Sequence, residues 1–427
     1  MLTTLVNAFR EKEIRKKMLL TLLMILIFRL GCFIPVPGIE SGSFQSLASN
    51  DFFSIMSTIT GGSLQNGTLF ALGIIPFINA FIIMQLLTLI IPPLDRLSKQ
   101  GEDGRKKITQ ITRYVAILLA VIQGIGICLG WGKGMFDETF GSTSLTMALV
   151  IIMLVGGSCL VMWLADRITE YGIGNGTSLI IFVGILASAG QALLNAFKNV
   201  GNGDVAKNVW LIIAFLVVVL FVFVFIIFVD LAERKITIQY AKQVKGNKMY
   251  GGQSTHIPMK VNASGVMPII FASSFLMFPQ MIASFWPTSA FYQWWAKWLG
   301  IGTPIYIAVM CLLILFFSFF YSQIQFNPDD ISKNIQQNGG FIPGIRPGRP
   351  TADFLKRINN RITLFGAIFL ALIALVPSVV FKFIGSENGL ANSFSATGLL
   401  IVVSVAMEFD TQLQNQLMMK HYKGFLK

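Results

Sequence analysis

The stretch Gly73-Ile74-Ile75-Pro76-Phe77-Ile78 is matched in outline by Gly265-Val266-Met267-Pro268-Ile269-Ile270. Both read Gly-x-x-Pro followed by apolar residues, and each stands at the start of the second apolar run in its half of the chain. Proline is common in the first turn of membrane helices, so either motif alone says little. Two motifs at matching places favour an internal repeat whose halves each contain a helix broken at the same point.

Ten apolar runs fill most of the 427 residues, of which 54% are hydrophobic and only 12% charged. Soluble domains carry roughly 25% charged residues, and about 20 apolar residues cross a bilayer as a helix. We therefore predict an all-α polytopic membrane protein with ten transmembrane helices in two halves. Because five is odd, the two five-helix halves would insert with opposite orientation. The runs lie at about 18–36, 68–91, 111–130, 145–165, 178–197, 209–230, 264–286, 303–323, 362–385 and 397–409.

Lysine and arginine gather on alternate connections between the runs. Of the 33 such residues, 26 fall on the side that carries the N-terminus and five on the opposite side. An excess of positive charge marks the cytoplasmic side, so both termini are predicted to be cytoplasmic. Arg29, deep in the first run, is expected to be a paired structural residue. The predicted organisation is an amphipathic N-terminal segment 1–17, halves 18–200 and 201–410 with basic cytoplasmic loops 231–263 and 324–361, and a tail 411–427.

The sequence contains no constellation of residues that indicates catalysis. It has two histidines, and no zinc-protease, nucleophile-elbow or P-loop motif occurs. The glycine-rich residues 172–176 follow no predicted strand, so a tight turn is favoured over a nucleotide site. Four cysteines lie inside apolar runs without metal-ligand spacing. We expect no enzyme, no cofactor and no metal, and the absence of acidic residues near mid-membrane argues against an ion-coupled carrier.

Three segments outside the runs have patterns of their own. Residues 51–62 look helical but are too short and polar to span. They either fold back into the membrane under cover of protein or lie on its outer surface. The alternation in 234–240 predicts a strand or hairpin, and the Pro and Gly of 339–349 predict a stiff turn with arginine at its tip. These basic loops suit either an acidic or RNA-bearing partner or anionic lipids.

Seven stretches together resemble the SecY/Sec61-alpha family of protein-conducting channels, and the similarity runs from about residue 5 to the C-terminus. The resemblance implies a clamshell hinged between the fifth and sixth helices. It also implies a channel that moves unfolded secretory polypeptides across the bacterial plasma membrane and releases transmembrane segments laterally. The stretches are Phe33–Gly38, Ala71–Pro76, Gln85–Thr88, Glu102–Lys107, Ile168–Gly176, Gln253–Pro258 and Phe341–Gly348.

The resemblance also implies roles for individual residues. An apolar pore ring would consist of Ile74, Ile78, Ile181, Ile185, Ile270 and Ile401. A plug at about 52–63 would include Phe52, Phe53, Ile55, Met56 and Ile59. A lateral gate between helices two and three and helices seven and eight would be lined by Gln85, Gln123, Asn262 and Ser274. Docking of SecA or the ribosome would involve Lys245, Lys248, Arg346 and Arg349. The ring pairs 74/78 and 181/185 each share a helix face, as ordinary apolar packing would also require.

The partners implied by the resemblance are the SecE and SecG subunits, the SecA motor, the ribosome, signal sequences, unfolded polypeptides and anionic lipids. SecA, translation or the proton-motive force would supply the energy. Two other functions stay open from the residues alone. A secondary transporter should place ligand-like groups at the helix breaks, where isoleucine and phenylalanine stand here. A protein that only docks at a lipid surface would not need two matched breaks.

Overall fold

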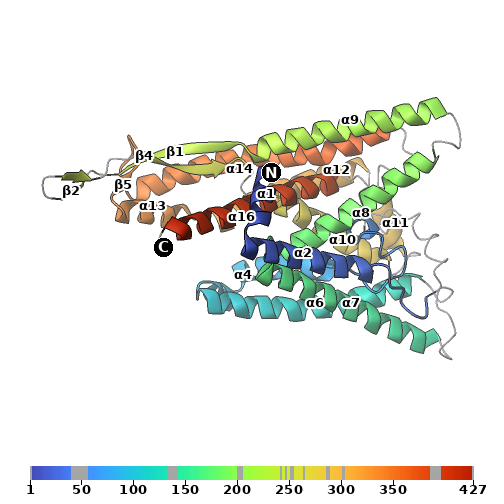
Figure 1. The fold of residues 1–427 in the computed structure, drawn as a ribbon. Coiled ribbons are helices and arrows are strands. Elements are labelled where there is room, and N and C mark those ends of the chain that lie inside the picture. Colours follow the sequence, from blue (N-terminus) through green and yellow to red (C-terminus); the bar gives the residue numbers. More distant parts are fainter. Residues whose placement is uncertain are drawn as a thin grey trace.

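An α-helix overlaps each predicted apolar run in the computed structural model (Figure 1). The structure describes residues 2–39, 56–131, 143–199, 205–240, 243–245, 248–250, 254–262, 265–284, 289–300, 303–384 and 396–425. The helices on the runs are α2 (Lys12–Gly31), α4 (Ile75–Ile90), α6 (Glu102–Trp131), α7 (Thr143–Tyr171), α8 (Gly176–Asn199), α9 (Val205–Asp230), α10 (Met267–Ser284), α12 (Pro304–Gln325), α14 (Arg349–Ile384) and α16 (Ala396–Phe425). Within these ranges, five helices are long and apolar enough to cross a membrane, or six if the bent pair α4 and α5 (Pro92–Ser98) counts as one span.

The two Gly-x-x-Pro motifs adopt the same backbone conformation. Gly73 and Gly265 have φ values of +53° and +59°, in the left-handed region that glycine adopts without strain. The prolines follow within the first turn of α4 and α10, where a missing N–H costs nothing. The helices therefore begin at Ile75 and Met267, later than the apolar runs themselves.

Backbone hydrogen bonds repeat around the two glycines. The N–H of each glycine donates to the carbonyl three residues earlier, and the residue after the glycine accepts two bonds that start the helix. These bonds are Gly73 N to Phe70 O (2.9 Å), Phe77 N and Ile78 N to Ile74 O (both 3.1 Å), and, in the second half, Gly265 N to Asn262 O (3.3 Å), Ile269 N to Val266 O (3.1 Å) and Ile270 N to Val266 O (3.2 Å). The predicted match between the two helix starts is confirmed.

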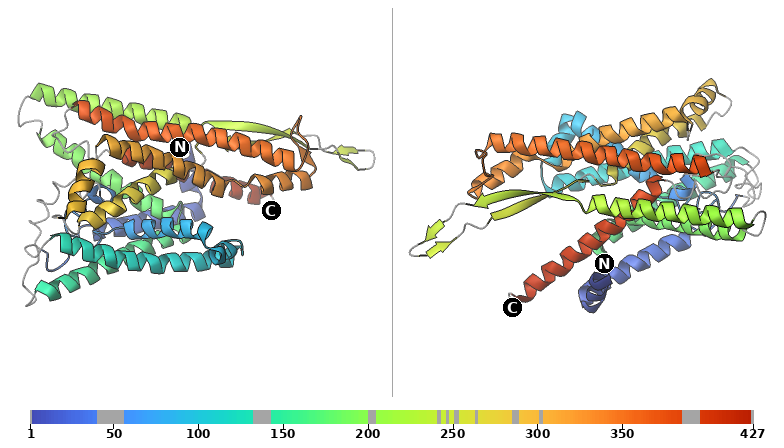
Figure 2. Two further views of the ribbon diagram at one scale, coloured as in Figure 1. Left: turned by 180° about the vertical axis from the view of Figure 1, so that it is seen from behind. Right: turned by 90° about the horizontal axis from the view of Figure 1, so that it is seen from above.

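The predicted hairpin in loop 231–263 is confirmed. Strand β1 (Glu233–Tyr240) pairs antiparallel with β4 (Ser254–Lys260) and also with the short β5 (Gly340–Phe341), giving the order β4-β1-β5. Buried isoleucines of β1 pack against α13 (Pro328–Gln337) and the start of α14 in a small core of their own. The strands extend away from the helix assembly, and the hairpin of β2 (Gln243–Lys245) and β3 (Lys248–Tyr250) lies at their far tip (Figures 1 and 2).

Two helices extend more than ten residues beyond their apolar runs. α14 begins at Arg349, although its run begins at 362, and α16 continues to Phe425, although its run ends at 409. Much of the predicted basic loop 324–361 and of the tail 411–427 is therefore helical. The exposed residues of these extensions alternate with buried ones such as Leu355 and Leu413, so each extension is an amphipathic helix that an apolar-run search does not detect.

The apolar interior and the apolar exterior are both large. One cluster of buried side chains joins α2, α4, α7, α8, α9, α10, α12, α14 and α16. Other large apolar side chains point outward, among them Ile152 (71% exposed), Phe221 (69%) and Phe228 (72%). In water such a surface would aggregate, whereas lipid chains meet it at no cost.

Candidate functional site

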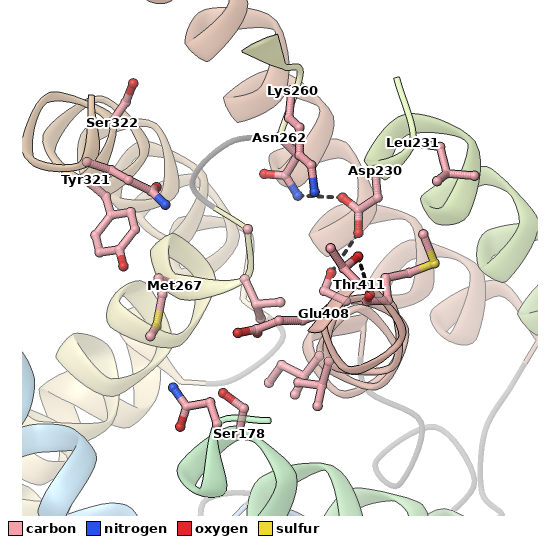
Figure 3. A pocket seen from close by; sticks show the side chains of 18 of the residues that line it. Ser178, Asp230, Leu231, Lys260, Asn262, Met267, Tyr321, Ser322, Glu408 and Thr411 are labelled. Atoms are coloured by element: carbon pink, nitrogen blue, oxygen red, sulfur yellow. Dashed lines mark hydrogen bonds between the residues drawn. The ribbon is translucent and has the colours of Figure 1, made fainter. Parts of the chain in front are cut away.

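A cavity of about 750 Å³ lies where α8, α9, α10, α12 and α16 converge (Figure 3). Its lining includes polar and charged groups together with a set of isoleucines. The polar members are Asn175, Ser178, Asp230, Glu233, Lys260, Asn262, Ser322, Gln325, Asn359, Ser404, Glu408, Thr411 and Gln412, and the isoleucines are Ile181, Ile270 and Ile401.

The polarity of this lining changes along the helices. On the α8 side it runs from Asn175 through Ser178 to Ile181, and on α16 it runs from Glu408 through Ser404 to Ile401. Six or seven residues at 1.5 Å per residue give a depth of about 10 Å. The cavity therefore begins among polar groups on the side of the strands and ends at isoleucines inside the helix assembly.

A half-buried carboxylate ties three segments of the chain together at the cavity wall. Asp230, at the end of α9, accepts a hydrogen bond from Asn262 Nδ2 (2.8 Å) and another from Ser404 Oγ on α16 (3.0 Å). In Figure 3 the Asp230 carboxylate lies beside Asn262 at the cavity wall, and a dashed line marks their hydrogen bond. Sequence reasoning placed Asp230 at the end of a run but gave no sign of these partners, because they are 32 and 174 residues away.

All six predicted ring isoleucines belong to the same apolar cluster. Five are buried members of it, and Ile270 packs against it half-buried. Ile181, Ile270 and Ile401 also line the cavity. The cluster contains many other apolar side chains. The structure therefore places the six isoleucines in one apolar interior but does not by itself identify them as a gate.

The described part of the predicted plug is covered by protein. Phe52, Phe53 and Ile55 lie outside the described residues, whereas Met56 is buried and Ile59 half-buried. Ser188 Oγ on α8 donates to Thr58 O (3.0 Å). A Cβ added at Gly184 of α8 would lie 2.5 Å from Ile59 O, so the two backbones are in close contact. Residues 56–61 therefore pack inside the protein. The alternative prediction, that this segment lies on the outer surface of the membrane, is wrong for these residues.

The deep arginine also contacts this segment. Arg29 Nη1 donates to Gly61 O at 3.4 Å, and its guanidinium lies over the Phe33 ring, 5.5 Å from the centroid. These contacts confirm Arg29 as a structural residue. The predicted turn at 172–176 is also present between α7 and α8, and Ile173 N donates there to Thr21 Oγ1 (3.1 Å).

The predicted gate residues occupy different environments. Gln123 of α6 is fully buried, and both atoms of its amide have no hydrogen-bond partner among the described residues. Gln85 and Ser274 are half-buried on α4 and α10, and Asn262 is engaged by Asp230. Helix α10 contacts both α4 and α6, so the two halves of the chain meet along the boundary at which a gate is predicted.

The predicted docking residues lie on the side of the strands. Lys245 and Lys248 are paired positions in the backbone register of the β2–β3 hairpin. Arg346 is exposed in the turn after β5, and its carbonyl accepts from Thr351 Oγ1 (2.8 Å). Arg349 is also exposed, but it is the first residue of α14 and not part of the turn.

A family model described as SecY matches residues 68–409. This chain belongs to the SecY family. Similar curated relatives are the protein translocase subunits SecY of Bacillus subtilis and of Streptomyces galbus, both 41% identical with all of each chain covered. The SecY of Thermus thermophilus is 39% identical over all of this chain and 98% of its own. The match extends along the whole chain, and this SecY-family member is a protein translocase subunit and a multi-pass membrane protein.

Solved structures confirm the fold of this SecY-family member. A structure described as that of a protein-conducting channel superposes with a TM-score of 0.69 at 22% identity, covering 93% of this chain and 91% of the other. The canine Sec61 channel in its ribosome complex gives 0.66 at 21% identity, with the same coverage of each chain. Helices of similar arrangement thus occur in channels whose sequences differ at most positions.

Proposed function

We propose that this protein forms the passage through which unfolded secretory polypeptides cross the bacterial plasma membrane. The observation that carries the proposal is the cavity whose polar mouth gives way to Ile181, Ile270 and Ile401. Ile270 lies at the start of α10, one of the two matched helices. A polypeptide would enter the wetted mouth and then push through an apolar constriction. Ions and water do not cross a dry constriction readily, so the same isoleucines would seal the resting channel.

The proposed topology has ten spans in two inverted halves, hinged between α8 and α9. It is supported by a helix on each of the ten runs, by the repeated hydrogen bonds around Gly73 and Gly265, and by the 26 to five distribution of basic residues. Both termini and the strands would then lie in the cytoplasm.

The plug and the lateral gate are part of the same proposal. Residues 56–61, seated against α8, would form the inner part of a plug at about 52–63 that blocks the passage at rest. The boundary between α10 and α4 with α6 would open sideways. An apolar signal sequence would leave through that boundary because it gains about 25 cal/mol for each Å² of apolar surface that reaches lipid.

External partners would drive the polypeptide through this channel. Two structural relatives, canine Sec61 and the yeast Ssh1 complex (TM-score 0.63), were solved bound to ribosomes. The β2–β3 hairpin and the exposed Arg346 and Arg349 would meet the ribosome or SecA here. SecE and SecG would complete the membrane complex, anionic lipids would neutralise the remaining basic surface, and SecA, translation or the proton-motive force would supply the energy.

Cross-linking of an arrested secretory chain tests the passage directly. The four native cysteines are first replaced by serine, and single cysteines are placed at Ile78, Ile185 or Ile270. The matched control is a cysteine at Ile152 of α7, which is 71% exposed on the outer surface. We expect cross-links from the three interior positions and none from the control. The proposal would be contradicted if the control position cross-linked with the same yield as the interior positions, or if none of the three interior positions cross-linked.

A further inference from the structure

A short helix at the end of the molecule opposite the β2–β3 hairpin has an exposed aromatic face. This helix, α11 (Ala290–Leu299), lies between α10 and α12 and contacts both (Figures 1 and 2). It is too short to cross a bilayer, and the family assignment gives it no role. Its sequence AFYQWWAKWL contains five aromatic residues and one charge.

The aromatic residues of α11 divide into two groups around the helix. Tyr292, Trp295 and Leu299 are half-buried and face the protein. Phe291, Trp294 and Trp298 are 48%, 53% and 46% exposed, and their spacing of three and four residues puts them within about 60° of one another. An exposed aromatic face of this size needs a covering that the described residues do not supply.

The polar residues of α11 lie opposite the combined apolar arc. At about 100° per residue, Gln293 and Lys297 project to the other side of the helix axis, and both are exposed. A helix with one apolar side, one polar side and clustered tryptophans is suited to the plane of the membrane interface, where indole rings prefer the headgroup level.

The neighbours of α11 place it at the edge of the lipid-facing surface. Helix α12 starts beside it and exposes Ile305, Leu312 and Phe316 along its length, so the apolar exterior continues from α12 to α11. Thr303 joins the two helices, because its Oγ1 donates to Trp298 O (2.9 Å) and accepts from Tyr306 N (3.2 Å) in the first turn of α12. A contact that fixes the position of Trp298 therefore also fixes the position of the first turn of α12.

We propose that α11 is an interfacial anchor, which inserts Phe291, Trp294 and Trp298 into the headgroup and acyl-chain boundary of the leaflet opposite the hairpin. The occupant of the aromatic face is the lipid interface itself. Through Thr303, this insertion fixes the depth at which α12 enters the bilayer.

Fluorescence quenching in proteoliposomes of phosphatidylcholine and phosphatidylglycerol tests the anchor. Three chains each keep one indole of α11, at Trp294, Trp298 or Trp295, and carry phenylalanine at the other six tryptophan positions. Lipids brominated near the headgroup, lipids brominated near the chain ends and aqueous iodide serve as quenchers. We expect Trp294 and Trp298 to lose most fluorescence with the shallow bromines and less with the deep ones, and Trp295 to be protected from all three.

Two outcomes would overturn the anchor. Strong iodide quenching of Trp294 and Trp298 without bromine quenching would place the face in water, and no quenching by any agent would mean that protein covers it. If the phenylalanine-substituted chains fail to fold, nitroxide labels at single cysteines replace the fluorescence measurement. Labels at 294 and 298 should collide mainly with oxygen, and labels at 293 and 297 mainly with a water-soluble nickel complex. Equal accessibility of all four positions to the nickel complex would reject the proposal.

Discussion

Replacing Gly184 by alanine should displace the segment that we propose as the inner part of the plug. Gly184 lies on α8, beside Ile59, and a Cβ at this position would approach Ile59 O to 2.5 Å. The obstructing atom belongs to the backbone, so rotation of a side chain cannot relieve the clash. Gly190, on the same helix, is the matched control, because an added Cβ there meets nothing within 4 Å.

The size of the effect follows from this distance. Ordinary contact begins at 3.4 Å, so residues 59–61 must move away from α8 by about 0.9 Å. Forcing one extra methyl group into a packed interior costs about 1–3 kcal/mol. If that free energy falls only on the seated state, the population of the displaced state should rise about 5- to 150-fold.

Ion leakage through reconstituted channels measures this population. Proteoliposomes that contain Gly184→Ala should lose a potassium gradient faster than wild type in the absence of a translocating chain, and Gly190→Ala should match wild type. A thermal-unfolding measurement on both variants separates a displaced segment from a damaged fold. Equal leakage of Gly184→Ala and Gly190→Ala, with both folded, would refute the seating of residues 56–61 as a seal.

Three further substitutions test other parts of the site. Ile270→Asn should wet the constriction and let proteins with defective signal sequences be exported more readily, while Ile270→Val should not; unchanged export would count against the ring. Asp230→Asn should lower the free energy of unfolding by about 1–2 kcal/mol, since hydrogen bonds to a charged acceptor are the stronger ones. The control is Asp330→Asn, because the Asp330 carboxylate accepts its hydrogen bond from Asn327 (2.7 Å) at an exposed site. This control should lower the free energy of unfolding by less than half as much. Equal losses of stability in the two variants would contradict a stabilising role for the Asp230 hydrogen bonds. Arg346→Glu should impair SecA- or ribosome-coupled transport several-fold, whereas Lys333→Glu, exposed on α13, should not; equal activities would remove the docking role of the turn.

The positions of the membrane helices could be predicted because apolar runs report burial in lipid directly. The helical extensions of α14 and α16 could not be predicted in this way, because their cytoplasmic parts are amphipathic and carry many charges. The starts of α4 and α10 were displaced by several residues from the run boundaries, since Gly73 and Gly265 hold a left-handed turn first. Sequence hydropathy contains no signal for such a turn.

The candidate site was less predictable than the fold. The isoleucines could be named from the family resemblance, and the structure brings them into one cluster. The bond between Asp230 and Ser404 spans 174 residues, and the close approach of Gly184 to Ile59 spans 125. Contacts of this separation depend on how whole helices pack, so a single sequence cannot show them.

The way in which residues 58–73 are held fits a seal that must open. Side chains of three helices donate hydrogen bonds to backbone carbonyls of this region: Arg29 of α2 to Gly61 O (3.4 Å), Ser158 of α7 to Gly73 O (3.1 Å) and Ser188 of α8 to Thr58 O (3.0 Å). Bonds to carbonyls do not depend on the side chains of the segment, so its sequence can change while its position is kept. Each bond contributes only about 0.5–3 kcal/mol, and the two at residues 58–61 together contribute a few kcal/mol. That is within the differential affinity by which a bound ligand shifts a two-state equilibrium. An entering polypeptide that offsets these bonds and the burial of Met56 would displace residues 56–61 without unfolding the helices that hold them.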